Sequence, residues 1–171
     1  MLPKFIKQLR KLVSYKSHTR SDEIASPGST PDLSLSEQKP LSILLLENKH
    51  SDATRAVSVL NRAGFKVSAH VVSSENAFRR QIASRTFDVV LADYWAGAWN
   101  VLEALKVLQQ IKSDIPLILV TRMSRNDIIA ECLKRGAADY VRKEDLNFLP
   151  IAVRDAIRER RPNFFNTSGL I

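Results

Sequence analysis

Polar side chains of three chemical kinds stand where apolar runs of this sequence end. They are the oxygen donors Glu47, Asn48 and Asp93, the hydroxyl of Thr121, and the ammonium of Lys143. Converging carboxylates favour a hard cation such as Mg²⁺, which proteins hold with one or two carboxylates, waters and phosphate oxygens. A threonine and a lysine opposite them would bind phosphoryl oxygens. The set therefore suits phosphoryl transfer onto an aspartate, with the carboxylate as nucleophile.

Several other chemistries lack the residues they need. No glycine-rich turn follows the first apolar run, so a dinucleotide site is not expected. No serine or cysteine on a sharp turn has a histidine partner, which argues against a hydrolase. The single cysteine, Cys132, excludes an internal disulfide and a cysteine-based metal cage. It also fits a reducing compartment. We also expect a cytoplasmic protein that is not an enzyme.

The elements that must position these residues alternate between strand and helix along the chain. Strands are predicted in residues 41–47, 65–72, 87–93, 115–121 and 137–143, and helices in 51–64, 74–84, 99–111, 124–136 and 149–161. Strands that are apolar throughout indicate a parallel sheet covered on both faces. Right-handed crossovers then place helices on both sides. The sequence predicts a doubly wound α/β domain, whose ligands bind at the carboxyl ends of the strands.

Capping residues set the expected limits of two helices. Ser51 or Asp52 is the predicted N-cap of the first helix, and Gly64 follows its end. Ser124 is the predicted N-cap of the fourth helix, and Gly136 closes it.

The chain has 171 residues and a net charge of +8. Its sequence divides into four segments. Residues 1–16 have apolar residues at helical spacing between lysines and arginines, which predicts a short basic amphipathic helix. It could dock on its own domain, touch an anionic membrane surface or acidic partner, or hold another subunit. Residues 17–40 predict a flexible Ser/Pro-rich linker. A folded domain in 41–161 and a short tail in 162–171 complete the chain.

The segment 41–161 resembles a response-regulator receiver domain, the phosphoacceptor module of two-component signalling. Three motifs carry the resemblance. "DVVLADYWAGAWNVLEAL" resembles the stretch after the third strand, usually D-Y-x-L-P-x-x-x-G-L-E-A-L, while "IPLILVT" and "RGAADYVRKEDL" resemble the fourth- and fifth-strand motifs. The resemblance implies a five-stranded flavodoxin-like sheet in the order 2-1-3-4-5, with helices on both faces.

The resemblance also implies a role for each candidate residue. Asp93 would accept a phosphoryl group from the histidine of a kinase or phosphotransfer protein. Thr121 would donate a hydrogen bond to that group, and Lys143 would pair with Asp93 and then with the phosphate. Tyr140 falls where an aromatic ring swings inward when the threonine moves.

The resemblance implies a Mg²⁺ site formed by Glu47, Asn48, Asp93 and the backbone carbonyl of Trp95. The family normally has two acids after the first strand, and Asn48 stands in place of the second. One missing charge at close range lowers the expected affinity for Mg²⁺ by about one to three decades.

The loop after Asp93 departs from the family as well. Gly97 replaces the usual proline and Val101 the usual glycine. Two tryptophans, Trp95 and Trp99, either pack on this edge of the domain or anchor a partner. These departures keep a second hypothesis open: a pseudo-receiver that acts as a protein interaction module without phosphate.

Expected partners follow from the resemblance and from the charges. The face formed by the fourth helix, fifth strand and fifth helix carries a basic set suited to an acidic partner or a second receiver, comprising Lys134, Arg135, Arg142, Arg154 and Arg158. Direct DNA binding is not expected, because the basic residues are dispersed. The ten residues after the last helix are too few for an output module, so we expect a stand-alone receiver that signals by protein–protein contact and could pair with itself.

Overall fold

The computed structural model describes residues 39–160. The predicted segments 1–16 and 162–171, and nearly all of 17–40, lie outside the described residues. Five parallel strands form one sheet in the order β2-β1-β3-β6-β7. They are β1 (Leu41–Leu46), β2 (Val67–Val72), β3 (Val89–Ala92), β6 (Leu117–Thr121) and β7 (Asp139–Arg142). This order confirms the predicted 2-1-3-4-5 arrangement.

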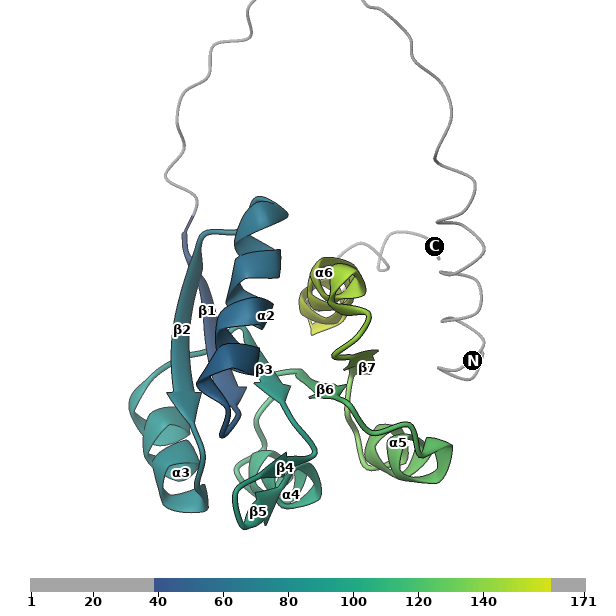
Figure 1. Ribbon diagram of the computed structural model, residues 1–171. Coiled ribbons are helices and arrows are strands. Elements are labelled where there is room, and N and C mark those ends of the chain that lie inside the picture. The colour runs from purple at the N-terminus through teal and green to yellow at the C-terminus, as the bar shows by residue number, and fades with distance from the viewer. Residues whose placement is uncertain (1–38, 161–171) are drawn as a thin grey trace, which may run out of the picture. The chain divides into compact units, whose positions relative to one another are not determined.

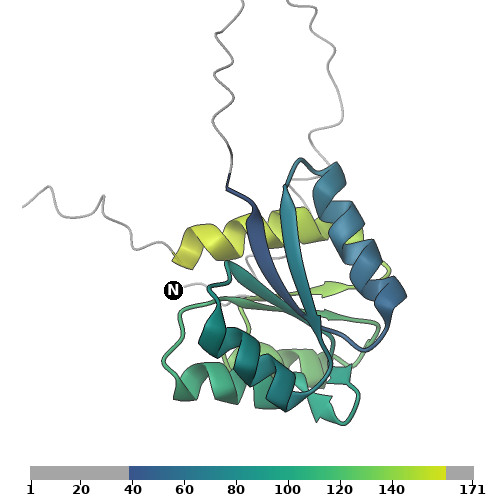
Figure 2. The same ribbon diagram turned by 90° about the vertical axis from the view of Figure 1, so that its left-hand side faces the viewer.

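Within residues 39–160, four α-helices connect the strands and a fifth follows the last strand, and together they cover both faces of the sheet (Figures 1 and 2). They are α2 (His50–Arg62), α3 (Glu75–Ser84), α4 (Val101–Gln110), α5 (Asn126–Lys134) and α6 (Leu149–Arg160), the last preceded by the short 3-10 helix η1 (Leu146–Phe148). Helices α2 and α6 pack on one face, and α3, α4 and α5 pack on the other. Within the described residues, no helix is long and apolar enough to cross a bilayer.

Alternate residues of the central strands enter two separate cores. In β1, Leu44 and Leu46 face α3 and α4, whereas Ile43 and Leu45 face α2 and α6. All four are buried. A strand that is buried on both faces must be apolar at every position, which is the pattern from which the parallel sheet was predicted.

The predicted caps of two helices are wrong. Lys49 is the N-cap of α2 and has no side-chain cap bond, while Asp52 lies in the first turn and is buried. The Asp52 carboxylate instead bonds to two side-chain cations, which are stronger partners than a backbone N–H. Arg125 is the N-cap of α5, and the Ser124 hydroxyl accepts a hydrogen bond from Arg142. The predicted ends hold, since Gly64 and Gly136 follow the C-caps with positive φ.

A small hairpin follows Asp93 that the sequence did not predict. Strands β4 (Trp95–Ala96) and β5 (Trp99–Asn100) pair antiparallel around Gly97, whose φ is +69°. A positive φ at this turn favours glycine. This conformation accounts for Gly97 at the position where the family usually has proline. The hairpin leads directly into α4, whose N-terminus is closed by a capping box of Asn100 and Glu103.

Candidate functional site

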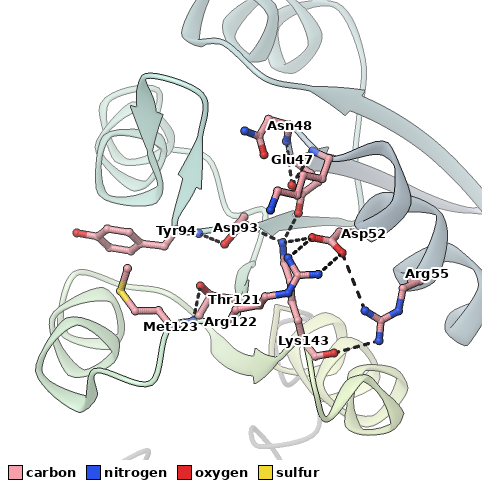
Figure 3. A network of polar contacts seen from close by, with 11 residues as sticks. Glu47, Asn48, Asp52, Arg55, Asp93, Tyr94, Thr121, Arg122, Met123 and Lys143 are labelled. Atoms are coloured by element: carbon pink, nitrogen blue, oxygen red, sulfur yellow. Dashed lines mark hydrogen bonds and ion pairs between the residues drawn. The ribbon is translucent and has the colours of Figure 1, made fainter.

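The ammonium of Lys143 is the centre of a cluster of acids at the carboxyl end of the sheet (Figure 3). Its Nζ lies 2.5 Å from Glu47 Oε2, 2.9 Å from Asp52 Oδ2 and 2.6 Å from Asp93 Oδ2. Glu47 follows β1, Asp93 follows β3 and Lys143 follows β7. The parallel sheet therefore brings together three of the residues that the sequence analysis placed at strand ends.

All three N–H donors of Lys143 are used in these bonds, because an ammonium has three protons. The Lys143 side chain is only 3% exposed. Burial acts to lower the pKa of Lys143, but its hydrogen bonds to Asp93, Glu47 and Asp52 outweigh burial and raise the pKa above its usual range. Lys143 thus remains charged and holds three carboxylates together.

Asp52 has a second cationic partner in Arg122. The guanidinium donates from Nη1 to Asp52 Oδ2 at 2.9 Å and from Nη2 to Asp52 Oδ1 at 2.7 Å, a bidentate pair. Burial acts to raise the pKa of Asp52, but hydrogen bonds from Lys143 and Arg122, together with their charges, lower it below its usual range. Asp52 is therefore ionised and shared between a buried cation and a half-exposed one.

The Asp93 carboxylate is the most accessible of the three acids. Its side chain is 19% exposed, compared with 6% for Glu47 and 4% for Asp52. Oδ1 accepts a hydrogen bond from the backbone N–H of Tyr94 at 2.7 Å, and Oδ2 accepts from Lys143. The Asp93 carboxylate therefore has a fixed position and still meets solvent.

Thr121 ends β6, the strand that pairs with β3. Its side chain is buried, and its hydroxyl accepts a hydrogen bond from the backbone N–H of Met123 at 3.1 Å. That bond uses a lone pair of the oxygen and leaves the hydroxyl proton to be donated elsewhere. Figure 3 shows Thr121 on the same side of the site as Arg122 and Met123.

The carboxylates among the predicted Mg²⁺ ligands already accept hydrogen bonds in the described conformation. Glu47 Oε1 accepts from the backbone N–H groups of Asn48 and Lys49, and Oε2 accepts from Lys143. Both oxygens of Asp93 also have donors. Asn48 is exposed, and the described residues contain no group of three or more His, Cys, Asp or Glu side chains placed to hold a metal. Lys143 and Arg122 balance most of the acidic charge instead.

The aromatic residues around the site divide into buried and exposed members. Trp99 is buried and packs against Phe78 of α3, with ring centroids 5.1 Å apart. Trp95 is 49% exposed and has an edge contact with Tyr94. Tyr140 is half-buried and packs against the core under α3, α4 and α5. One tryptophan is therefore structural, and the other is available at the surface beside Asp93.

Two residues of the cluster were missed by sequence reasoning. Asp52 was interpreted as a helix cap and Arg122 was not singled out. Arg122 could have been found from the sequence, because it directly follows Thr121, at a strand end that was already predicted to be part of the site. Asp52 gave no such signal, because its partners lie 70 and 91 residues away along the chain.

The chain is similar in sequence to known proteins. The family model of the response regulator receiver domain matches residues 43–154. The transcriptional regulatory protein ZraR of Klebsiella oxytoca is 27% identical over 120 residues, covering 70% of this chain and 27% of that protein. The regulatory protein VirG of Agrobacterium tumefaciens (strain 15955) is 30% identical over 121 residues, covering 70% of this chain and 42% of that protein. The chain thus spans less than half the length of these relatives.

Solved structures show the same fold. The receiver domain of the Francisella response regulator 1452 aligns with a TM-score of 0.61 at 20% identity, covering 70% of this chain and 98% of that one. Full-length FixJ from B. japonicum aligns with a TM-score of 0.64 at 20% identity, covering 71% of this chain and 59% of that one.

Proposed function

The chain belongs to the response-regulator receiver family, and on that premise we propose that Asp93 accepts a phosphoryl group from a histidine kinase or a phosphotransfer protein. The observation that carries the proposal is the unequal exposure of the acids around Lys143. Only Asp93 combines a 2.6 Å contact to the ammonium with a side chain that is 19% exposed. A phosphodonor can reach its oxygen, whereas Glu47 and Asp52 are almost closed to solvent.

The proposed reaction is an in-line displacement at phosphorus. An oxygen of Asp93 attacks, and an acyl-phosphate O–P bond forms. The P–N bond to the donor imidazole breaks, and its electron pair returns to the ring nitrogen. Lys143 neutralises charge beside the attacking oxygen, and Tyr94 N–H keeps the other carboxylate oxygen in place. The hydroxyl of Thr121 donates to the phosphoryl group, and Tyr140 follows the movement of the threonine.

We expect this chain to bind Mg²⁺ only weakly. A metal would need oxygens of Glu47 and Asp93 that already accept hydrogen bonds, and Asn48 supplies no charge. The affinity for Mg²⁺ is therefore expected to be weak, in line with the expected loss of about one to three decades.

The downstream signal is proposed to leave by protein–protein contact, through the face formed by α5, β7 and α6. The basic set predicted for that face included Arg154, and for this residue the prediction is wrong. Arg154 donates to the Ala63 carbonyl and lies over the Phe65 ring, so it is directed toward the end of α2. Stand-alone action, self-pairing, a cytoplasmic location and a membrane role of residues 1–16 remain predictions.

Phosphorylation can be tested by incubating the full chain with a small phosphodonor such as phosphoramidate and then measuring its intact mass. We expect the mass of one phosphoryl group to be added to the wild type. Asp93→Asn, which keeps the shape of the side chain, should gain none. Asp127→Asn, which changes an exposed acid outside the cluster, should behave like the wild type.

A second candidate function is a pseudo-receiver that binds a partner without phosphate. Two observations favour it: Asn48 replaces an acid, and three carboxylates already occupy all the protons of Lys143. A wild-type chain that gains no mass at any Mg²⁺ concentration would contradict phosphorylation and leave this candidate.

A further inference from the structure

Arg122 occupies a position next to the proposed phosphorylation site without being one of the residues assigned to it so far. It directly follows Thr121, and its side chain is 49% exposed, so its guanidinium approaches the acid cluster from the solvent side (Figure 3). The hydrogen bonds from Arg122 to Asp52 and the charge of Asp52 raise the pKa of Arg122, and the charge of Asp93 raises it further. Arg122 therefore lies within the electrostatic reach of Asp93.

The donors of the cluster are unequally used. All three N–H donors of Lys143 are hydrogen-bonded to carboxylates. Arg122 has five N–H donors and gives two of them to Asp52 in the part of the chain that the structure describes. A phosphoryl group on Asp93 brings three acceptor oxygens. Arg122 is thus the neighbouring cation with donors to spare, and a guanidinium suits bidentate binding of phosphate.

Asp52 would not be left unpaired if Arg122 moved away. Its Oδ2 keeps the bond from Lys143 at 2.9 Å, and Arg55 Nη1 lies 4.0 Å from its Oδ1. The cost of a buried charge without a partner, which normally opposes the breaking of such a pair, is therefore avoided.

The charge of the cluster favours an exchange. Three carboxylates and two cations give a net charge of −3 + 2 = −1. Phosphorylation replaces the single charge of Asp93 by about −1.5 to −2. The phosphoryl group is then more negative than Asp52, whereas the two carboxylates carried equal charges before.

We propose that Arg122 binds the phosphoryl group on Asp93 and gives up Asp52 to do so. This inference rests on the proposed function and names a further residue of the same site. The exchange connects the phosphoryl group to the first turn of α2, because Asp52 loses one of its two close cationic partners. Asn48 replaces an acid and is expected to weaken the binding of Mg²⁺. Arg122 thereby supplies positive charge at this site.

A set of four variants of the full chain tests the exchange through the lifetime of the phosphorylated form. Each is treated with phosphoramidate at one fixed Mg²⁺ concentration and followed by intact mass. Arg122→Ala is expected to shorten the lifetime by about ten- to a hundredfold, the value of one charge-assisted hydrogen bond. Asp52→Asn removes the competing charge and should lengthen it. Arg125→Ala, which breaks the exposed pair with Asp127 in the same loop, should match the wild type.

The opposite changes in lifetime expected for Arg122→Ala and Asp52→Asn distinguish an exchange of partners from a purely structural ion pair. A purely structural ion pair broken from either side would shift the lifetime in the same direction. In the double variant, Asp52→Asn with Arg122→Ala, the gain from Asp52→Asn should disappear, because it requires Arg122. The Nε–H resonance of Arg122 should also shift on phosphorylation in the wild type.

Two results would overturn the inference in distinguishable ways. If the wild type is phosphorylated but Arg122→Ala decays like Arg125→Ala, the exchange is wrong and the proposed function stands. If the wild type takes no phosphoryl group at all, the proposed function fails and this inference fails with it.

Discussion

Lys143 Nζ and Asp52 Oδ2 lie 2.9 Å apart, although the two residues are 91 positions apart in the sequence. This contact adds the buried carboxylate of Asp52 to the acids around Lys143, for which the sequence predicted only Asp93. The first turn of α2 is thereby fastened to the end of β7. The acid cluster is consequently a structural element as well as a candidate reaction site.

Replacing Lys143 by methionine should destabilise the fold strongly. Methionine is of similar length but has no charge. The substitution therefore leaves three carboxylates without their shared cation. Loss of one partner from a buried ion pair costs about 3–5 kcal/mol. Urea unfolding at neutral pH measures this loss, with Lys106→Met on the exposed side of α4 as the control. A loss no larger than that of the control would contradict the role of Lys143 at the centre of the cluster.

The stability contributed by Asp52 should depend on pH. Its pKa is lowered in the fold, so the folded state binds fewer protons than the unfolded chain, in which the value is about 3.9. The stabilisation is therefore present above about pH 3.9 and is lost as the pH falls through the lower pKa of the folded state.

Asp52→Asn should accordingly unfold more easily than the wild type at neutral pH, by about 1–3 kcal/mol, with the half-exposed Arg122 favouring the lower end. Urea unfolding over a series of pH values should show the difference shrinking below about pH 3.9. Asp127→Asn is the matched control, since Asp127 has an arginine partner but both side chains are exposed. A difference that stays constant over the series would mean that the charge of Asp52 is not its cause.

The two tryptophans should differ sharply in their effect on stability. Trp99 is buried against Phe78, so Trp99→Ala should cost about 3–5 kcal/mol. Trp95 is 49% exposed, and Trp95→Ala should change the free energy of unfolding by about 0.5 kcal/mol or less. Chemical denaturation of the two variants side by side provides the comparison. Equal losses would show that the hairpin after Asp93 depends on both rings.

The thiol of Cys132 should be unreactive in the folded chain. Cys132 is fully buried in α5, and burial raises its pKa to about 11. The thiolate is the reactive form, so a thiol reagent at mildly alkaline pH should label the native chain far more slowly than the chain in urea. Rapid labelling without denaturant would indicate that α5 opens locally.

The fold and the strand-end residues could be predicted because their signals are local. Residues 43–46 are apolar at every position, which is typical of a strand covered on both faces. Gly64 and Gly136 mark helix ends because the chain there has positive φ. Once a parallel sheet is predicted, Glu47, Asp93 and Lys143 must meet at its carboxyl edge.

The partners within the cluster could not be predicted, because they depend on tertiary contacts. An aspartate near the start of a helix is usually a cap, and the sequence around Asp52 gives no sign of two cations that directly follow β6 and β7. Trp99 is similar, since it lies in β5 and its burial depends on Phe78 of α3. The hydrogen bonds that Lys143 donates to Glu47, Asp52 and Asp93 are visible only in three dimensions.

The most direct test of the central claim is to locate the phosphoryl group. The phosphorylated chain can be treated with borohydride, which reduces an acyl phosphate of aspartate to homoserine, and then sequenced by fragmentation mass spectrometry. Homoserine at position 93 alone is the predicted result. Reduction at Asp52 or Glu47 instead, or no homoserine in a chain that carries the phosphoryl mass, would contradict Asp93 as the phosphoacceptor.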